Sequence, residues 1–207
     1  MGGRREKDAP SAWDERRLYW LFAAFGGGAS WFGSTLCFME IPLYQRHFHG
    51  LELSNRLELG YNMGTIPAAL FVIAVGCGWR SSRSGRVACV FGLLAVNLGC
   101  VCLLCATVPG SPLFSVSTLA VAQFLGGSAG YMSQFVCVPY LVGGFENALV
   151  GAFWTGDALT SVFAAFVALA QRPSRPRFSL GTYLSVAGPP VILASLAAFV
   201  YIERSGA

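Results

Sequence analysis

The segment GGGASWFGSTLCFMEIP, residues 26–42, joins small residues to an apolar stretch and ends with a carboxylate, Glu40, two residues before Pro42. A charged side chain at the end of an apolar helix is costly in hydrocarbon unless it faces protein, water or a ligand. The segment therefore predicts a membrane-embedded helix with one special polar position near its far end. We expect the remaining helices to form walls around that position.

The composition excludes a soluble globular protein. The 207 residues are 55% hydrophobic and 12% charged, with a mean hydropathy of +0.58, whereas a soluble domain carries roughly 25% charged residues. A run of ~20 apolar residues crosses a bilayer as a helix. Six such runs predict an all-α membrane protein with six transmembrane helices.

The expected organisation is a single bundle between two short tails. We expect a polar tail over residues 1–17, a six-helix bundle over residues 18–202 and a short tail over residues 203–207. The spans are expected at residues 18–38, 59–79, 87–107, 114–142, 148–171 and 180–202. No cleavage site follows a short apolar core near the start, so we expect the first span to stay as an anchor.

Basic residues predict the orientation of these spans. Of the 14 lysines and arginines, nine lie on the side of the expected N-terminal tail and five on the opposite side. Because cytoplasmic loops are enriched in basic residues, this bias places both termini in the cytoplasm. The three arginines in residues 172–177 oppose this orientation.

No pattern typical of catalysis or of metal binding is found, so neither an enzyme nor a cofactor or metal site is expected. The candidate functional residues are polar or aromatic side chains at membrane depth. They are Trp31, Thr35, Glu40, Asn62, Gln134 and Asp157. Amides and carboxylates can hydrogen-bond a polar heterocycle or a polyol, and aromatic faces can stack on a ring.

Simpler roles stay open for several of these residues. Asn62 and Gln134 could be hydrogen-bond partners between helices, and Glu40 could lie at the membrane interface. Asp157 is deeper, where an unpartnered carboxylate is a liability without a function. Gly60 and Gly64, four residues apart, predict a close approach between two helix backbones.

Four short motifs follow one another in order along the chain. They are SW at residues 30–31 with EIP at residues 40–42, YNMG at residues 61–64, SQFVCVPYL at residues 133–141 and FWTGDALT at residues 153–160. In order and in near-constant spacing, these motifs resemble those in the N-terminal half of the eukaryotic riboflavin transporters, solute carrier family 52. Thr35, Gln134 and Asp157 stand where that family has Asn, Asn, and Glu or Gln.

The resemblance implies a function and an architecture. It implies riboflavin uptake across the plasma membrane, with an intracellular membrane as the alternative, by facilitated or proton-linked alternating access. It also implies one half of a bundle of the major-facilitator or equilibrative-nucleoside-transporter type. The family has about eleven helices in two bundles, so six helices would need a second half or another copy to enclose a solute. The candidate residues would bind the solute, and protonation of Asp157 or Glu40 would couple uptake to pH.

Two other classes of function compete with transport. A multi-span scaffold or regulatory subunit would use the same polar residues only to join helices. A membrane-embedded enzyme is disfavoured, since no nucleophile pair lies at one depth. In a transporter half, we expect Glu40, Asn62, Gln134 and Asp157 to converge on one concave face, whereas in a scaffold they would be scattered or paired.

Overall fold

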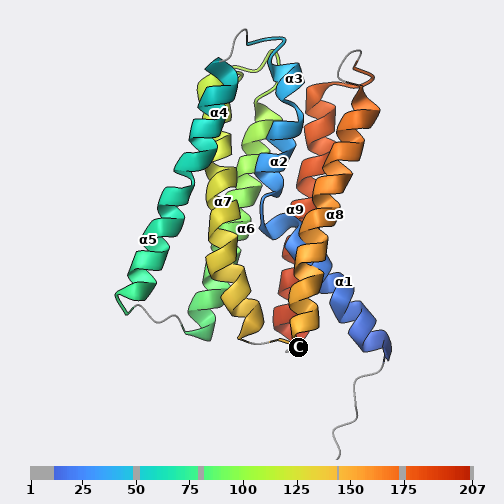
Figure 1. The fold of residues 1–207 in the computed structure, drawn as a ribbon. Helices are drawn as coiled ribbons and strands as arrows, with labels where there is room; N and C mark the ends of the chain where they lie inside the picture. Colours follow the sequence, from blue (N-terminus) through green and yellow to red (C-terminus); the bar gives the residue numbers. More distant parts are fainter. Residues whose placement is uncertain (1–11, 49–51, 79–81, 144, 173–175, 206–207) are drawn as a thin grey trace, which may run out of the picture.

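The structure, a computed structural model, describes residues 12–48, 52–78, 82–143, 145–172 and 176–205, and within these ranges all regular structure is helical. In chain order the helices are α1 (Ala12–Ala29), α2 (Phe32–Met39), α3 (Ile41–Tyr44), α4 (Glu52–Met63), α5 (Thr65–Gly76), α6 (Arg83–Ala106), α7 (Val116–Val142), α8 (Asn147–Gln171) and α9 (Leu180–Ser205), as labelled in Figure 1. Helices suit this apolar sequence because they satisfy backbone hydrogen bonds within each segment, where lipid offers no partner.

Four helical stretches of the described residues are long and apolar enough to cross a membrane: Glu52–Gly76, which joins α4 and α5, and the helices α6, α8 and α9. The bent pair of α1 and α2 makes a fifth if it crosses as one span. α7 has 27 residues and contains several glycines, serines and glutamines, and it is not among the helices that meet this criterion. The prediction of an all-helical protein with several spans is supported, although only four to five of the expected six spans meet this criterion.

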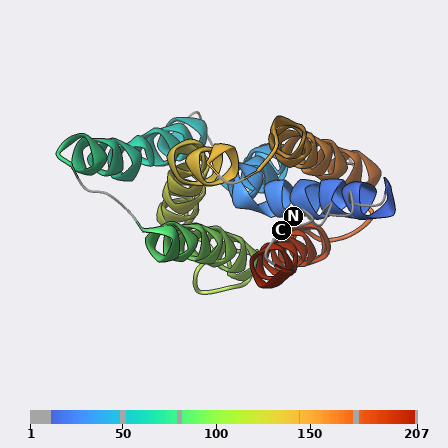
Figure 2. The ribbon, with the colours of Figure 1, turned by 90° about the horizontal axis from the view of Figure 1, so that it is seen from below.

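α2 lies at the centre of the bundle, where it contacts α6, α7, α8 and α9. α1 packs along α8 and α9, and α6 packs on α7 and α9. α4 and α5 lie at one edge and pack mainly on α7, as the view along the bundle in Figure 2 shows. α1 begins and α9 ends at the same end of the bundle (Figure 1).

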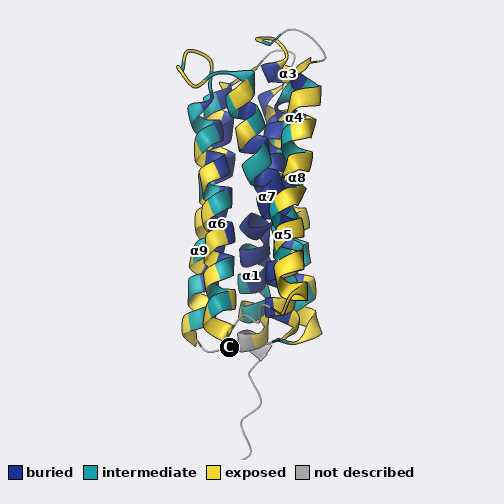
Figure 3. Ribbon diagram, turned by 90° about the vertical axis from the view of Figure 1, so that its left-hand side faces the viewer, coloured by how far each residue is buried: buried dark blue, intermediate teal, exposed yellow. Residues whose placement is uncertain are grey.

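Buried residues gather on α1 and α7 (Figure 3), and many of the exposed residues on the outer faces are large and apolar. On α5, Leu70 and Ile73 are 62% and 60% exposed, and on α8, Phe166 and Leu169 are 66% and 68% exposed. Large apolar side chains exposed together would be unfavourable in water. They suit a surface that contacts lipid.

The first span is broken, contrary to our expectation of one helix over residues 18–38. α1 ends at Ala29 and α2 begins at Phe32, and the two helices are bent by 59° across Ser30 and Trp31. Hydropathy alone does not register such a break, because the residues on both sides of it are apolar. The break instead depends on partners from other helices, which are described below.

Glycines allow backbones to touch at two helix crossings. A Cβ atom at Gly156 on α8 would lie 1.7 Å from the carbonyl oxygen of Ala23 on α1. A Cβ at Gly127 on α7 would lie 2.4 Å from the carbonyl oxygen of Tyr61 on α4, and one at Gly64 would lie 2.5 Å from a backbone nitrogen of α7. The close approach that we predicted at Gly64 is therefore confirmed, and its partner is α7.

Helix ends extend further into polar sequence than hydropathy predicts. α1 begins at Ala12 instead of residue 18, and α4 begins at Glu52 instead of residue 59. Glu52 and Arg56 form an ion pair four residues apart, which supports a helix whose surface is polar. Residues 1–11 of the expected tail lie outside the described residues.

We expect Gly127→Ala to destabilise the protein, because the new methyl group would meet the backbone of α4. Overpacking of this kind typically costs about 1–3 kcal/mol, so the thermal unfolding midpoint in mild detergent should fall by several degrees. Gly99→Ala on α6 is the matched control, since nothing lies within 4 Å of its added Cβ. A midpoint for Gly127→Ala equal to that of the control would contradict the contact.

Candidate functional site

The break between α1 and α2 leaves backbone carbonyl groups without helical partners, and an amide from another helix takes two of them. Asn97 on α6 donates through Nδ2 to the carbonyl oxygens of Gly28 and Ser30, at 2.7 and 3.0 Å. Asn97 is fully buried. A buried carbonyl without a partner costs about 1–3 kcal/mol. By satisfying two carbonyls, the side chain of Asn97 removes this cost and stabilises the bent conformation.

Two hydroxyl groups support the end of α1 from the other side. Thr160 on α8 is placed to donate to the carbonyl oxygen of Gly27 at 3.0 Å. Ser195 on α9 donates to the carbonyl oxygen of Phe25 at 2.5 Å. Three different helices therefore satisfy the last turn of α1, and the break is a fixed feature of the packed bundle.

Asp157 lies near the middle of α8 and faces the break. Its carboxylate is within hydrogen-bonding reach of the Ser30 side chain and of the backbone N–H of Trp31, just before α2 begins. A carboxylate beside the first N–H groups of a helix is favourable, because these groups carry partial positive charge. Oδ1 of Asp157 is buried and has no hydrogen-bond partner among the described residues. Asp157 thus keeps one acceptor available at the break.

Aromatic side chains from two other helices lie against Trp31. The ring of Tyr131 on α7 meets it edge-on, with centroids 4.8 Å apart, and the ring of Tyr61 on α4 lies 5.7 Å away. The two tyrosine rings are 5.5 Å apart. Gly130 leaves space for the indole ring of Trp31, because a Cβ atom at this position would lie 2.0 Å from Trp31 Cε3. We name Trp31, Tyr61 and Tyr131 the aromatic cluster.

The predicted site residues divide into those that reach the break and those that do not. Thr35 lies one turn after Trp31 and donates to its carbonyl oxygen at 3.2 Å. Asn62 follows Tyr61 but is exposed on α4, and Gln134 is half-buried on α7, one turn beyond Gly130. Trp31 and Asp157 are therefore brought together, Thr35 lies one turn further along α2, and Asn62 and Gln134 lie on helices that flank the break.

Glu40 does not join this group, so the expectation that it shares a face with Asp157 is wrong. It follows α2 and is 1% exposed, and its electrostatic neighbours include Cys37, Tyr44 and, on α9, Tyr183. Nine residues after Trp31, a helical position has turned by about half a revolution. Helical periodicity therefore predicts that Glu40 and Trp31 face different sides of α2. The motif spacing in the sequence gives no sign of this difference.

Two residues that contact the break were missed in the sequence, Asn97 and Tyr131. Asn97 is the one amide within the apolar stretch of residues 87–107, and a lone amide in a span is a signal that it bonds another helix. Tyr131 directly follows Gly130, the glycine that leaves room for the indole of Trp31. The structure pairs both residues with the break.

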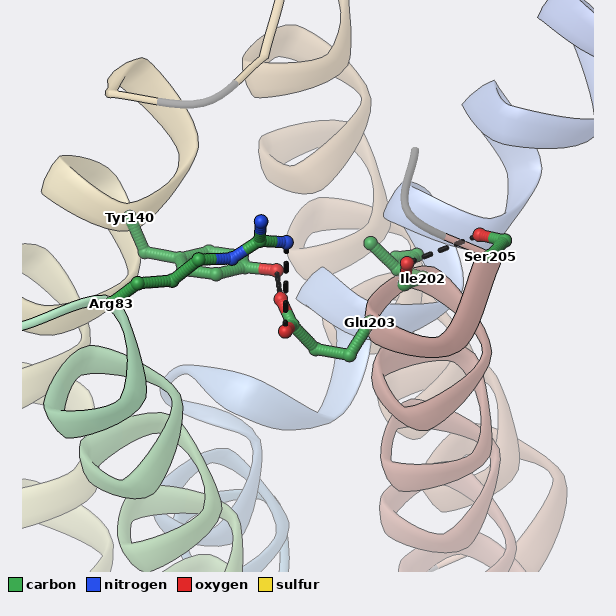
Figure 4. Close-up of polar contacts among 5 residues, drawn as sticks. All are labelled: Arg83, Tyr140, Ile202, Glu203 and Ser205. Atoms are coloured by element: carbon green, nitrogen blue, oxygen red, sulfur yellow. Dashed lines mark hydrogen bonds and ion pairs between the residues drawn. The ribbon is translucent and has the colours of Figure 1, made fainter.

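The end of the bundle where the chain terminates has a separate polar group, shown in Figure 4. Tyr140 on α7 donates to Oε1 of Glu203 on α9, and Arg83 on α6 lies 3.9 Å from Oε2 of the same carboxylate. These contacts join three helices. Glu203 therefore belongs to the bundle, although the sequence placed it in the terminal tail.

Comparisons with family models, with curated proteins and with solved structures find no match to this chain. The fold and the site define the class by themselves: a helical protein with four to five helices able to span a membrane and a first helix broken at its polar centre. The resemblance to riboflavin transporters stays a prediction.

We expect Asn97→Leu to lower the free energy of unfolding by about 2–4 kcal/mol, because two buried carbonyl oxygens would lose their donor. Unfolding by a denaturing detergent would measure the loss. Asn62→Leu is the control, since Asn62 is exposed and such surface changes stay within about 0.5 kcal/mol. Equal losses in the two variants would show that the break does not depend on Asn97.

Proposed function

We propose that the chain forms one wall of a membrane transporter for riboflavin that works by alternating access. The observation that carries this proposal is the broken first helix, with the aromatic cluster and a carboxylate at the break. Transporters commonly place solute sites where a spanning helix is interrupted, because the free backbone groups and helix ends there bind polar ligands. The motifs that resemble the riboflavin transporters fall on the same residues, Trp31 and Asp157.

The chemistry of the break suits an uncharged ring with a polyol chain. The aromatic cluster offers ring faces and edges for a flat heterocycle, and stacking of this kind contributes roughly 0.5–1.5 kcal/mol for each aromatic pair. Asp157 Oδ1 can accept a hydrogen bond from a hydroxyl group. Riboflavin carries both of these chemical features.

The proposed architecture is a half-bundle of six spans, with the bent pair and α7 counted as two of them. At 1.5 Å per residue, the 27 residues of α7 extend about 40 Å, which is longer than the ~30 Å hydrocarbon core. α7 packs beside the break and is covered by its neighbours, so it tolerates glycines, serines and glutamines in its sequence. Asn62 on the flanking α4 would face the second wall.

The second wall must come from another half or from a second copy of the chain. In such transporters the solute lies between two bundles that rock about it. Asn62 is exposed and Gln134 and Asp157 are half-buried, so this face retains polar groups that a partner would cover. The expected location of the assembly is the plasma membrane.

A scaffold or regulatory subunit is the second candidate, and a specific observation favours it. Asn97, Thr160 and Ser195 all bond the backbone of α1, so these polar side chains join helices. Glu40 is also remote from Asp157. The two candidates differ in whether the chain itself binds a flavin.

Riboflavin binding by the purified chain in lipid nanodiscs tests the proposal, with flavin fluorescence as the readout. Stacking on an aromatic ring quenches the flavin, so we expect saturable quenching by the wild-type chain. Trp31→Ala should weaken binding about 10-fold or more, which corresponds to ~1.4 kcal/mol, because it removes the centre of the aromatic cluster.

Trp20→Ala is the matched control, because Trp20 on α1 is 63% exposed and remote from the break in sequence. It should bind riboflavin as the wild type does. No saturable quenching by the wild-type chain up to about 1 mM riboflavin, the weak end of specific affinities, would favour the scaffold. Uptake into proteoliposomes would then show whether binding leads to transport.

A further inference from the structure

Glu40 is a buried carboxylate that the proposed riboflavin site does not use. Both of its carboxyl oxygens are buried and have no hydrogen-bond partner among the described residues. Most buried polar groups in proteins are hydrogen-bonded, and an unpaired buried charge is especially costly. A buried carboxyl group without a hydrogen-bond partner is unusual, so we ask in which protonation state it is stable.

Among the described residues, no cation is found to act on the carboxyl group of Glu40, whose pKa is shifted by burial alone. Its titratable neighbours are Cys37 on α2, Tyr44 on α3 and Tyr183 on α9, with Cys100 and Cys105 of α6 next to Tyr44. From α7, Gln123 bonds Cys37 and is not titratable. All of these groups are neutral at pH 7, so nothing in the described surroundings offsets a negative charge on Glu40.

The neutral acid is therefore the form that this environment favours. Glu40 follows the last residue of α2 and lies outside the spanning helices, and burial raises the pKa of its carboxyl group to about 7. The hydroxyl of Tyr44 is also buried without a partner. Both groups can exist there as uncharged O–H donors, at a lower cost than a carboxylate.

A pocket lies near this position, at the loop end of the bundle. It has a volume of about 350 Å³, and Leu43 and Leu180 line it together with Arg46 and His47. Leu43 and Leu180 each lie one helical turn from a member of the buried group, Glu40 and Tyr183 respectively. Arg46 and His47 are the charged and titratable residues that line this pocket.

We propose that Glu40 is a proton-binding site on the opposite side of α2 from the break, reached from this pocket. In the conformation described here Glu40 holds the proton as a neutral carboxylic acid. When α3 and the start of α9 separate, water enters, the acid releases the proton to that water, and the carboxylate is hydrated. This role does not depend on riboflavin being the solute.

A monovalent cation is the rival occupant, and the donor set disfavours it. Na⁺ is a hard cation that prefers several oxygen ligands, whereas thiols suit softer metals. The group around Glu40 supplies thiol and phenol groups, with both carboxyl oxygens as the strongest donors. The experiment below separates the two occupants.

Thermal stability of the chain in nanodiscs, measured between pH 5 and pH 8, tests the proton site. The carboxyl pKa is about 7 in the folded protein and 4.5 for a free group. The stability that Glu40 contributes is therefore complete below pH 4.5 and is lost as the pH rises through 7. We expect the wild-type midpoint to fall over this range by several degrees more than that of Glu40→Gln, which is neutral at every pH.

Glu58→Gln is the matched control, because Glu58 is exposed on α4 and its loss should leave the wild-type pH dependence intact. Equal pH dependence in the wild type and Glu40→Gln would overturn the proposal. A midpoint that rises with NaCl but not with an equal ionic strength of choline chloride, at fixed pH, would overturn it in favour of a cation.

Infrared spectroscopy gives a second readout on the wild-type chain, in case Glu40→Gln does not fold. With ¹³C-labelled glutamate, a protonated carboxyl group shows a shifted C=O band. We expect this band at pH 6 and its loss by pH 8.5. Its absence at pH 6 would mean that Glu40 is ionised and would overturn the proposal, whether or not riboflavin binds.

Discussion

The hydrogen bonds from Asn97 to the carbonyl oxygens of Gly28 and Ser30 are the constraint on which the rest of the structure depends. A bend of 59° inside a spanning helix exposes backbone groups that lipid cannot satisfy. The amide satisfies two of them at once. Because Thr160 and Ser195 take further carbonyls of α1, the bend and the packing of α6, α8 and α9 stabilise one another.

The close contacts between helices position the polar and aromatic groups at the break. Gly156 lets α8 touch the backbone of α1, and this proximity brings Asp157 to the start of α2. Gly130 likewise makes room for Trp31 against α7. Small residues thus place the aromatic cluster and the carboxylate side by side, whereas the exposed apolar faces determine only that the bundle lies in lipid.

Much of the fold could be predicted from sequence, because apolar runs fix the existence of helices. The expected spans at residues 148–171 and 180–202 nearly coincide with α8 and α9. Helix ends and the break could not be predicted, since they depend on partners far along the chain. For the site, Trp31 and Asp157 were both named from sequence and both lie at the break, whereas Glu40 lies at the other end of α2, which helical periodicity could have indicated although the motif spacing did not.

The partners of the bent first helix are Asn97, Thr160 and Ser195, which lie roughly 70 to 170 residues after the carbonyls that they satisfy. A ribosome makes the first span long before these side chains exist. During synthesis the first span must therefore either cross the membrane as a straight helix or be protected from lipid by the insertion machinery. Asn97 becomes available with α6, Thr160 with α8 and Ser195 with α9, so a chain interrupted before Ser195 would lack one of the three partners of its bent first helix.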